Sequence, residues 1–287
     1  MKPLLLFGPT GSGKTALAVA LAKEIGGEVV NADSRLFYRG MDIGTAKPTE
    51  VERQGIPHYL IDMETPNRQV TAAQWREKAL GEIVGIHERG KRALVVGGTG
   101  FYMKILLAGW DLGQTPPDPQ KREGWMAQEE ESPGFLYKRL TALSPERASD
   151  LTPEDYPRLV RALELVEAGV KPGIGNPLEA QTVYLNPPRQ CVEERMETRI
   201  EVMWRRGLPQ EAEALWEAYP ESPVLGKTIG YSEFLEGGEE EQVKSRILQN
   251  TKRLAKRQRS WGRSLRMDLL LDGVDTDENL HLALQSV

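Results

Sequence analysis

The sequence has very little cysteine and no long apolar run. Cys191 is the only cysteine among 287 residues, which excludes an intramolecular disulfide and a cysteine-rich zinc site and suits a reducing cytoplasm. No stretch approaches membrane-spanning length, and the apolar run after Met1 is too short for a signal peptide. Excess positive charge is also missing, since the net charge is −5, which argues against indiscriminate binding to nucleic acid. We therefore expect a cytoplasmic protein with no membrane partner.

The chain begins with a pattern typical of phosphate binding. The apolar residues Leu4 to Phe7 predict a buried strand, and the pattern from Ala16 to Ile25 predicts an amphipathic helix. Between them stands a P-loop: Gly8, Pro9, Thr10, Gly11, Ser12, Gly13, Lys14 and Thr15. In such a loop the backbone amides curl around phosphate oxygens, lysine adds a point charge, and the threonine hydroxyl is placed to ligate Mg²⁺. The pattern predicts a phosphate site with Mg²⁺ at Thr15 and leaves the ligand open.

Strand and helix patterns alternate over the first hundred residues, which predicts a parallel sheet covered by helices. Strands are expected at residues 4–7, 28–30, 59–62, 93–96, 182–186 and 267–271. Long helices are expected at residues 71–87, 192–206 and 240–266. Between two breaks rich in proline and glycine, only helical patterns occur. We expect a P-loop NTPase-like α/β core of residues 1–110 and 182–287, interrupted by a helical insertion of residues 111–181.

The P-loop alone does not decide between phosphate chemistries. Enzymes that transfer a γ-phosphoryl group usually hold Mg²⁺ with an aspartate at a strand end, and Asp33 and Asp62 are candidates. The strand at 93–96 ends in glycine instead. Small-molecule kinases also need an arginine-bearing lid, which the insertion could supply. A kinase acting on a metabolite or nucleotide, with Asp33 as its base, therefore stays open as an alternative.

A basic segment stands near the end of this acidic chain. Residues 245–267 contain eight lysines or arginines and no acidic residue. Five of these cations fall on one helix face: Lys252, Lys256, Arg259, Arg263 and Arg266. The opposite face is apolar and carries Ile247, Leu254, Trp261 and Leu265. The pattern predicts a helix docked on the core, with an outward basic stripe that is either a solvated face or a track for a phosphate backbone.

Seven motifs occur in order along the chain. They are GPTGSGKT, NADSRLFYRGMDIGTAKP, GIPHYLID, GGTGFYMK, RLVRALE, IGY followed by Glu233, and AKRQRSW. In this order they resemble the tRNA dimethylallyltransferases, also called tRNA isopentenyltransferases. The resemblance covers nearly the whole chain, and the stretch from Asp33 to Pro48 is its most specific part. It implies that the P-loop holds the diphosphate of dimethylallyl diphosphate, and that the acceptor is the exocyclic amine of an adenine beside the anticodon of tRNA.

The resemblance also assigns roles to residues. It makes Asp33 the base that accepts the proton of the adenine amine, places Thr99 as a polar contact, and puts Lys14 and Arg199 at the leaving diphosphate. The tRNA contacts that it implies are Asp33, Ser34, Arg35, Leu36, Arg122, Arg158, Arg161, Lys256, Arg257, Gln258, Arg259 and Trp261. Many members have glutamine where this chain has Leu36. We expect a monomer whose partners are the anticodon stem-loop of tRNA and dimethylallyl diphosphate, with Mg²⁺ as cofactor.

A third possibility is an RNA-binding module with a vestigial P-loop. Such a module would bind tRNA through the basic helix and leave it chemically unchanged. Asp33 argues against it, because binding alone needs no carboxylate beside a phosphate loop. Turnover of ATP would distinguish the kinase from both other possibilities.

Overall fold

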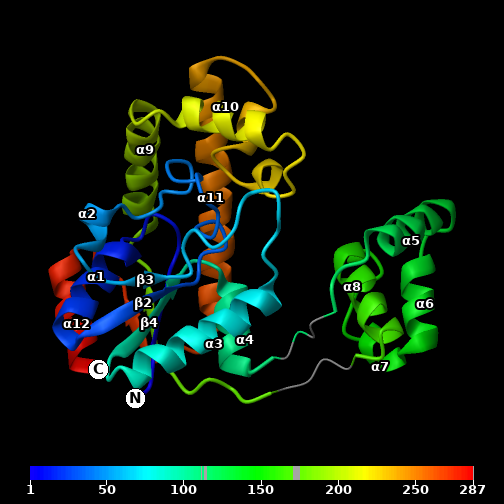
Figure 1. Ribbon diagram of the computed structural model, residues 1–287, viewed down its shortest axis with the longest axis horizontal. Helices are drawn as coiled ribbons and strands as arrows, with labels where there is room; N and C mark the ends of the chain where they lie inside the picture. The colour runs from blue at the N-terminus through cyan, green and yellow to red at the C-terminus, as the bar shows by residue number, and fades with distance from the viewer. Residues whose placement is uncertain (111, 113–114, 171–174, 287) are drawn as a thin grey trace. The chain divides into compact units, whose positions relative to one another are not determined.

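The chain divides into two compact units. The computed structural model describes residues 1–110, 112, 115–170 and 175–286 (Figure 1). One unit joins Met1–Ala108 to Leu178–Val287, and the other is Gly109–Pro177. The second unit therefore begins two residues before, and ends four residues before, the insertion placed from sequence at 111–181.

A parallel sheet forms the centre of the first unit. Its strands among the described residues are β1 (Leu4–Phe7), β2 (Gly27–Asn31), β3 (His58–Tyr59), β4 (Arg92–Gly97), β5 (Gln181–Leu185) and β6 (Leu269–Leu271). They lie in the order β3-β2-β4-β1-β5-β6, and every pairing is parallel. All residues of β1 and β2 are buried, as expected for strands covered by helices on both faces. The expected parallel α/β core is confirmed.

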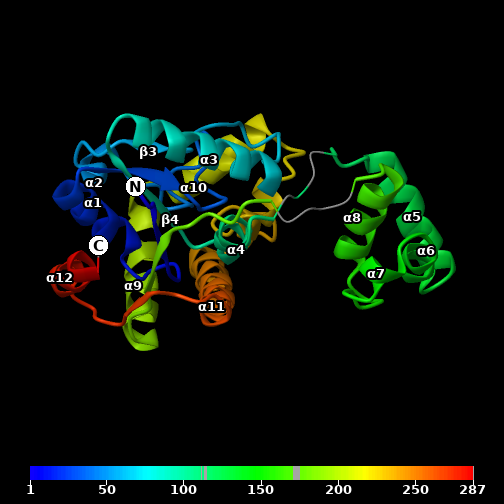
Figure 2. The same cartoon turned by 90° about the horizontal axis from the view of Figure 1, so that it is seen from below.

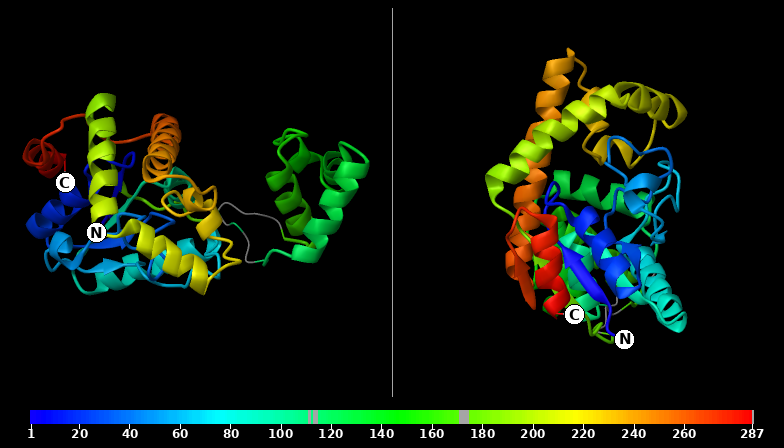
Figure 3. Two further views of the ribbon diagram at one scale, coloured as in Figure 1. Left: turned by 90° about the horizontal axis from the view of Figure 1, so that it is seen from above. Right: turned by 90° about the vertical axis from the view of Figure 1, so that its left-hand side faces the viewer.

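Helices cover both faces of this sheet. The first unit contains α1 (Lys14–Ile25), α2 (Glu50–Arg53), α3 (Ala72–Glu88), α4 (Gly100–Ala108), α9 (Arg189–Arg205), α10 (Leu208–Ala218), α11 (Glu240–Ser264) and α12 (Thr276–Ser286). Leu4 and Leu6 share one core with α1 and α12, which lie side by side (Figure 3). On the other face Trp75 of α3 stacks on Tyr102 of α4, with ring centroids 4.0 Å apart. Successive side chains of a strand point to opposite faces of the sheet, so each strand contributes side chains to the packing on both faces.

Strand β3 and helix α11 end earlier than expected from the sequence. Strand β3 stops before Leu60 instead of reaching Asp62, because both residues have left-handed backbones, with φ of 61° and 56°. The basic helix α11 ends at Ser264, so Leu265 and Arg266 lie beyond it. Periodicity within the segment could not show where the helix stops, since apolar and basic residues continue past its end.

The second unit is a small helical body with its own core. It contains α5 (Pro119–Glu131), α6 (Phe135–Leu143), α7 (Pro145–Ala148) and α8 (Tyr156–Glu167), shown in Figure 2. Its buried core includes Trp125, Leu136, Leu140, Leu159 and Leu163. The part of this unit that the structure describes contains helices and no strand. Within the described ranges of the whole chain, no helix combines the length and apolarity needed to cross a membrane.

Candidate active site at the carboxyl edge of the sheet

Three loops with predicted site residues leave neighbouring strands. The P-loop follows β1, Thr99 follows β4 and Asp33 follows β2, and these strands are consecutive in the sheet. Parallel strands end at the same edge, which is where open α/β sheets bind their ligands. The fold therefore brings Lys14, Thr99 and Asp33 to one edge.

The P-loop presents backbone amides at the start of α1. Gly11 and Gly13 have φ of 81° and 95°, a left-handed conformation that glycine adopts without strain. Gly13 caps α1 with no side-chain hydrogen bond, so the first amides of the helix keep their donors. Ser12 Oγ is buried and has no hydrogen-bond partner among the described residues. Such donors at a helix N-terminus form a site for an anion.

Lys14 connects the P-loop to the other charged groups of the site. Its ammonium donates to the carbonyl oxygen of Pro9 at 2.8 Å. Burial lowers the pKa of Lys14 to about 8, while the Asp33 carboxylate acts to raise it and the Arg199 guanidinium acts to lower it. The three groups are thus near enough to influence one another, although they come from α1, the loop after β2, and α9.

The turn after β2 holds Asp33 by its backbone. The Asp33 amide donates to Asn31 Oδ1 at 2.9 Å, and Asp33 Oδ1 accepts from the amide of Arg35 at 3.0 Å. The Ser34 amide donates to Thr99 Oγ1 at 3.3 Å, which joins this turn to the loop after β4. The side chain of Arg35 donates to the backbone oxygen of Lys227 at 2.9 Å. Asp33 itself remains only half-buried, so a substrate can reach its carboxylate.

Helix α9 contributes two arginines, one of which sequence reasoning missed. Burial lowers the pKa of Arg199, the predicted diphosphate contact. Arg195, one turn earlier, donates to the Ser12 oxygen of the P-loop at 3.2 Å and to the Val274 oxygen at 2.9 Å. The spacing of four residues between the two arginines places them on one helix face, and this signal could have found Arg195.

Helix α11 approaches the P-loop through Gln258. The amide of Thr10 donates to Gln258 Oε1 at 2.8 Å, and the Gln258 side chain is buried. Trp261 packs on Gly100, where an added Cβ would lie 2.4 Å from the Trp261 Cβ, and its ring centroid is 6.4 Å from that of Phe101. Two residues expected to contact tRNA thus hold α11 on the core, Gln258 at the P-loop and Trp261 at α4.

The basic stripe of α11 faces α9. The two helices lie side by side (Figure 1) and border a groove of about 420 Å³. Four of the predicted stripe residues line it: Lys252, Lys256, Arg259 and Arg263. Lys252 is neutralised by Glu193 at 3.4 Å and Glu197 at 3.1 Å. The expectation of five outward cations on one helix was wrong for Lys252, which is paired, and for Arg266, which lies outside the helix.

The three insertion arginines expected to contact tRNA have acidic partners inside the same unit. Arg122 donates to both oxygens of Glu164 at 2.7 Å, and Arg161 donates to Glu164 at 3.0 Å. Burial acts to raise the pKa of Glu164, but the hydrogen bonds from Arg122, Asp118 and Arg161 lower it to about 2. Arg158 is more open, since its side chain is 71% exposed beside Asp155. Sequence spacing did not reveal the pair of Arg122 and Glu164, because the two residues come from different helices, α5 and α8.

The chain is similar to known proteins over most of its length. The sequence model of the family described as IPP transferase matches residues 36–265. The chain belongs to the IPP transferase family. The tRNA dimethylallyltransferase of Pelotomaculum thermopropionicum is 38% identical over 279 residues, covering 91% of this chain and 88% of that protein. The tRNA dimethylallyltransferase 1 of Citrifermentans bemidjiense is 40% identical over 282 residues, covering 91% and 89%.

Solved structures of IPP transferases share the fold. The full-length tRNA isopentenylpyrophosphate transferase of Bacillus halodurans superposes with a TM-score of 0.74 at 32% identity, covering 99% of this chain and 95% of that chain. A eukaryotic dimethylallyltransferase acting on tRNA gives a TM-score of 0.78 at 28% identity, covering 91% of this chain and 69% of that chain. Family membership makes this chain a tRNA-modifying prenyltransferase and decides against the kinase alternative.

The start of α1 offers one oxygen ligand of the kind that a divalent cation takes, the hydroxyl of Thr15. Thr15 stands exposed in the first turn of α1, directly after Lys14. Within the described residues, no cluster of three or more His, Cys, Asp or Glu could hold a metal by itself. Mg²⁺ commonly takes one or two protein oxygens and completes its shell with phosphate oxygens and water. A hydroxyl beside a phosphate loop meets that requirement.

Diphosphate binding to this IPP transferase is expected to take up a proton near pH 8. Lys14 has a pKa of about 8 without an anion, and a bound anion raises it, so only the protonated form binds well. Affinity should therefore be full at lower pH and fall by up to about tenfold per pH unit above pH 8. Calorimetry with inorganic diphosphate, in buffers of different ionisation enthalpy, measures the uptake.

Lys14→Arg is the control for this titration. Arginine stays protonated throughout this range, so the variant should bind without the uptake. An uptake near pH 8 that persists in Lys14→Arg would assign the titration to another group.

Removing the Glu164 carboxylate is expected to destabilise the insertion. Glu164→Gln leaves the guanidinium groups of Arg122 and Arg161 without their shared negative charge, which should cost about 2 kcal/mol, because these two groups are themselves 41% and 31% exposed. Because the folded-state pKa of about 2 lies below the ordinary 4.5, this stabilisation is complete above 4.5 and is lost as pH falls toward 2. Hydrogen exchange in α5 and α8 reports it. Asp155→Asn, at the exposed Arg158 pair, should change little.

Proposed function

We propose that this chain transfers the dimethylallyl group of dimethylallyl diphosphate to the exocyclic N6 amine of an adenine adjacent to the anticodon in tRNA, and releases diphosphate. The observation that carries the proposal is that the P-loop after β1 and Asp33 after β2 lie at the same edge of the parallel sheet, which brings an anion-binding loop and a carboxylate together. This substitution requires groups that stabilise the leaving diphosphate and a base that accepts the proton of the amine.

The P-loop and α9 would act on the leaving group. As the bond between the allylic carbon and the diphosphate oxygen breaks, the electron pair goes to that oxygen, and its negative charge grows. The P-loop amides, Lys14 and Arg199 would neutralise this charge, because preorganised donors stabilise charge that develops in the transition state. Arg195 would hold the loop through the Ser12 oxygen. When bound at Thr15, Mg²⁺ would add positive charge to the same oxygens.

Asp33 would act on the nucleophile. The lone pair of the adenine amine is delocalised into its ring, so the amine attacks well only if its proton leaves as the carbon–nitrogen bond forms. The Asp33 carboxylate would accept that proton, and Thr99 would help to position the turn through the Ser34 amide. The adenine must leave its stack to reach this edge of the sheet.

Chemical analysis of tRNA tests the proposal directly. Unmodified tRNA is incubated with dimethylallyl diphosphate and Mg²⁺, and its nucleosides are then separated and weighed. We expect one prenylated adenosine per accepted tRNA and release of diphosphate. Binding of tRNA without modification, or ATP turnover with a small acceptor, would contradict the proposal.

We propose that tRNA phosphates lie along the open cations of α11. Lys256 and Arg257 are exposed, whereas Lys252 is paired with glutamates. Arg158 and Arg259 are further proposed contacts, together with the turn of Asp33, Ser34, Arg35 and Leu36. We also propose that the protein is a monomer. We further propose that it acts in the cytoplasm, since tRNA is its substrate and a single cysteine, Cys191, suits a reducing compartment.

Neutralising the open cations is expected to weaken the salt dependence of tRNA binding. Lys256→Gln with Arg257→Gln removes two phosphate contacts and should reduce the slope of log K against log salt by about one to two units. Binding measured at several salt concentrations gives the slope. Lys252→Gln is a control on the same helix, because Glu193 and Glu197 already hold its ammonium and its loss should remove no phosphate contact. If Lys252→Gln reduced the slope as much as the double change, the proposal that tRNA phosphates specifically contact Lys256 and Arg257 would be refuted.

A further inference from the structure

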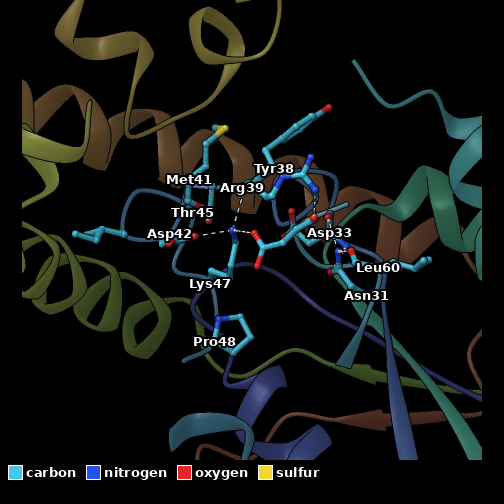
Figure 4. Close-up of polar contacts among 12 residues, drawn as sticks. Asn31, Asp33, Tyr38, Arg39, Met41, Asp42, Thr45, Lys47, Pro48 and Leu60 are labelled. Atoms are coloured by element: carbon cyan, nitrogen blue, oxygen red, sulfur yellow. Dashed lines mark hydrogen bonds and ion pairs between the residues drawn. The ribbon is translucent and has the colours of Figure 1, made fainter. Parts of the chain in front are cut away.

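Lys47 is buried at the centre of three converging segments. Its side chain is 5% exposed, and its ammonium donates to the Tyr38 oxygen at 2.8 Å, to Asp42 Oδ1 at 2.6 Å and to Asp62 Oδ1 (Figure 4). An ammonium has three protons, and all three are used here. Asp42 and Asp62 remain 55% and 42% exposed, so the cost of desolvation falls mainly on the lysine.

A buried ion pair is not in itself a source of stability. Desolvation offsets much of the attraction, and well-packed apolar residues often serve as well. A lysine that uses every donor to join three segments instead restricts those segments to one arrangement. Because the Lys47 ammonium stands between two carboxylates, its loss would also leave Asp42 and Asp62 to repel each other.

Backbone strain is concentrated around the same ammonium. Among the described non-glycine residues with positive φ, three lie here: Ala46 at 53°, Leu60 at 61° and Asp62 at 56°. Such conformations cost about 1–3 kcal/mol each and persist only where the surroundings hold them. Lys47 follows Ala46 directly and binds Asp62, so it is placed to hold both loops.

Residues 60–62, which Lys47 holds through Asp62, in turn fix the turn of residues 33–36 from two sides. The amide of Asp62 donates to the Leu36 oxygen at 3.2 Å. Asn31 Nδ2 donates to the Leu60 oxygen at 2.9 Å and to the Asp33 oxygen at 3.0 Å (Figure 4). The Leu36 amide closes the turn on the Asp33 oxygen at 3.3 Å. A shift of residues 60–62 would therefore move both ends of the turn.

We propose that Lys47 is a positioning residue for the prenyl transfer. Its ammonium holds residues 60–62 in a fixed position relative to residues 38–42. This position determines the direction in which the Asp33 carboxylate meets the adenine amine. The inference rests on the proposed role of Asp33. It leaves the P-loop and the binding of the prenyl donor independent of Lys47, since none of the hydrogen bonds of the ammonium reaches that loop.

Kinetics of Lys47→Met, alone and combined with Asp33→Asn, test this role. The single change should lower kcat by about ten- to a hundredfold and leave KM for dimethylallyl diphosphate within about threefold, since small displacements of catalytic groups cost this much. In the Asp33→Asn background the same change should cost less than about threefold, because residues that act through one group are not additive. Additive losses, or a kcat like that of the wild type, would overturn the proposal.

Two further variants separate positioning from general stability. Lys244→Met removes another buried lysine, 10% exposed and paired with Glu201 at 2.9 Å and Glu240 at 2.6 Å on α9 and α11. It should lower the thermal midpoint without the selective loss of kcat, and an equal loss of kcat would overturn the proposal. Asp62→Asn keeps Lys47 and weakens only its ion pair with residue 62. It should show the same kcat-selective, non-additive loss, and it decides the matter if Lys47→Met does not fold.

The wild-type assay keeps this inference apart from the proposed function. If the wild-type protein does not prenylate tRNA, the proposed function fails. If it does so and Asp33→Asn is impaired while both Lys47→Met and Asp62→Asn retain full kcat, only the role of Lys47 fails.

Discussion

Replacing Asp33 with asparagine is expected to lower kcat by about 10² to 10⁴, the usual value of general-base catalysis. Asparagine keeps the shape of the side chain, and its oxygen can still accept the Arg35 amide, so the turn should persist. An amide accepts a proton poorly, so the adenine amine loses its base. Single-turnover prenylation of tRNA measures the chemical step without product release.

Affinity measurements on the same variant separate two roles of the carboxylate. If Asp33 is the base, binding of tRNA and of the prenyl donor should change little, because the P-loop and α11 are unaltered. If Asp33 mainly holds Mg²⁺, donor affinity and the metal requirement should change together. A single-turnover rate like that of the wild type would remove Asp33 from the mechanism.

Replacing Lys14 with methionine is expected to lower kcat by about 10² to 10³, as measured when one preorganised donor to a developing anion is removed. Methionine fills the same space without the charge. The Lys14 ammonium is the group whose pKa responds to both Asp33 and Arg199, so its loss affects the site on the side of the leaving group. The rate at which prenyl transfer forms diphosphate and the affinity for the prenyl donor should both fall.

Lys23 provides a control on the same helix. It lies at the last turn of α1, and its ammonium donates to Gln54 Oε1 at 2.5 Å on the protein surface. Lys23→Met changes the charge of α1 by the same amount at a site away from the P-loop, and turnover should stay close to that of the wild type. Equal losses in both variants would mean that the general field of the helix, and not contact with diphosphate, is responsible.

Elements defined by neighbouring residues could be read from the sequence. The apolar run of β1, the glycines of the P-loop and the long helices α3, α9 and α11 follow from local periodicity and turn chemistry. The parallel sheet follows from their alternation, and the motifs led to the family. The meeting of Asp33 and Thr99 with the P-loop also follows, because parallel strands end at one edge.

The partner of each charged side chain depended on the tertiary structure. Lys252 and Lys256 lie four residues apart on one helix, yet only Lys252 meets glutamates, because those come from α9. Arg122 is paired with Glu164, which is 42 residues away in the chain. Gln258 accepts from a P-loop amide 248 residues away. Spacing along a helix gives the direction of a side chain, but the packing of distant segments decides whether it meets solvent, a carboxylate or a backbone amide, and hence whether its charge is free to bind tRNA.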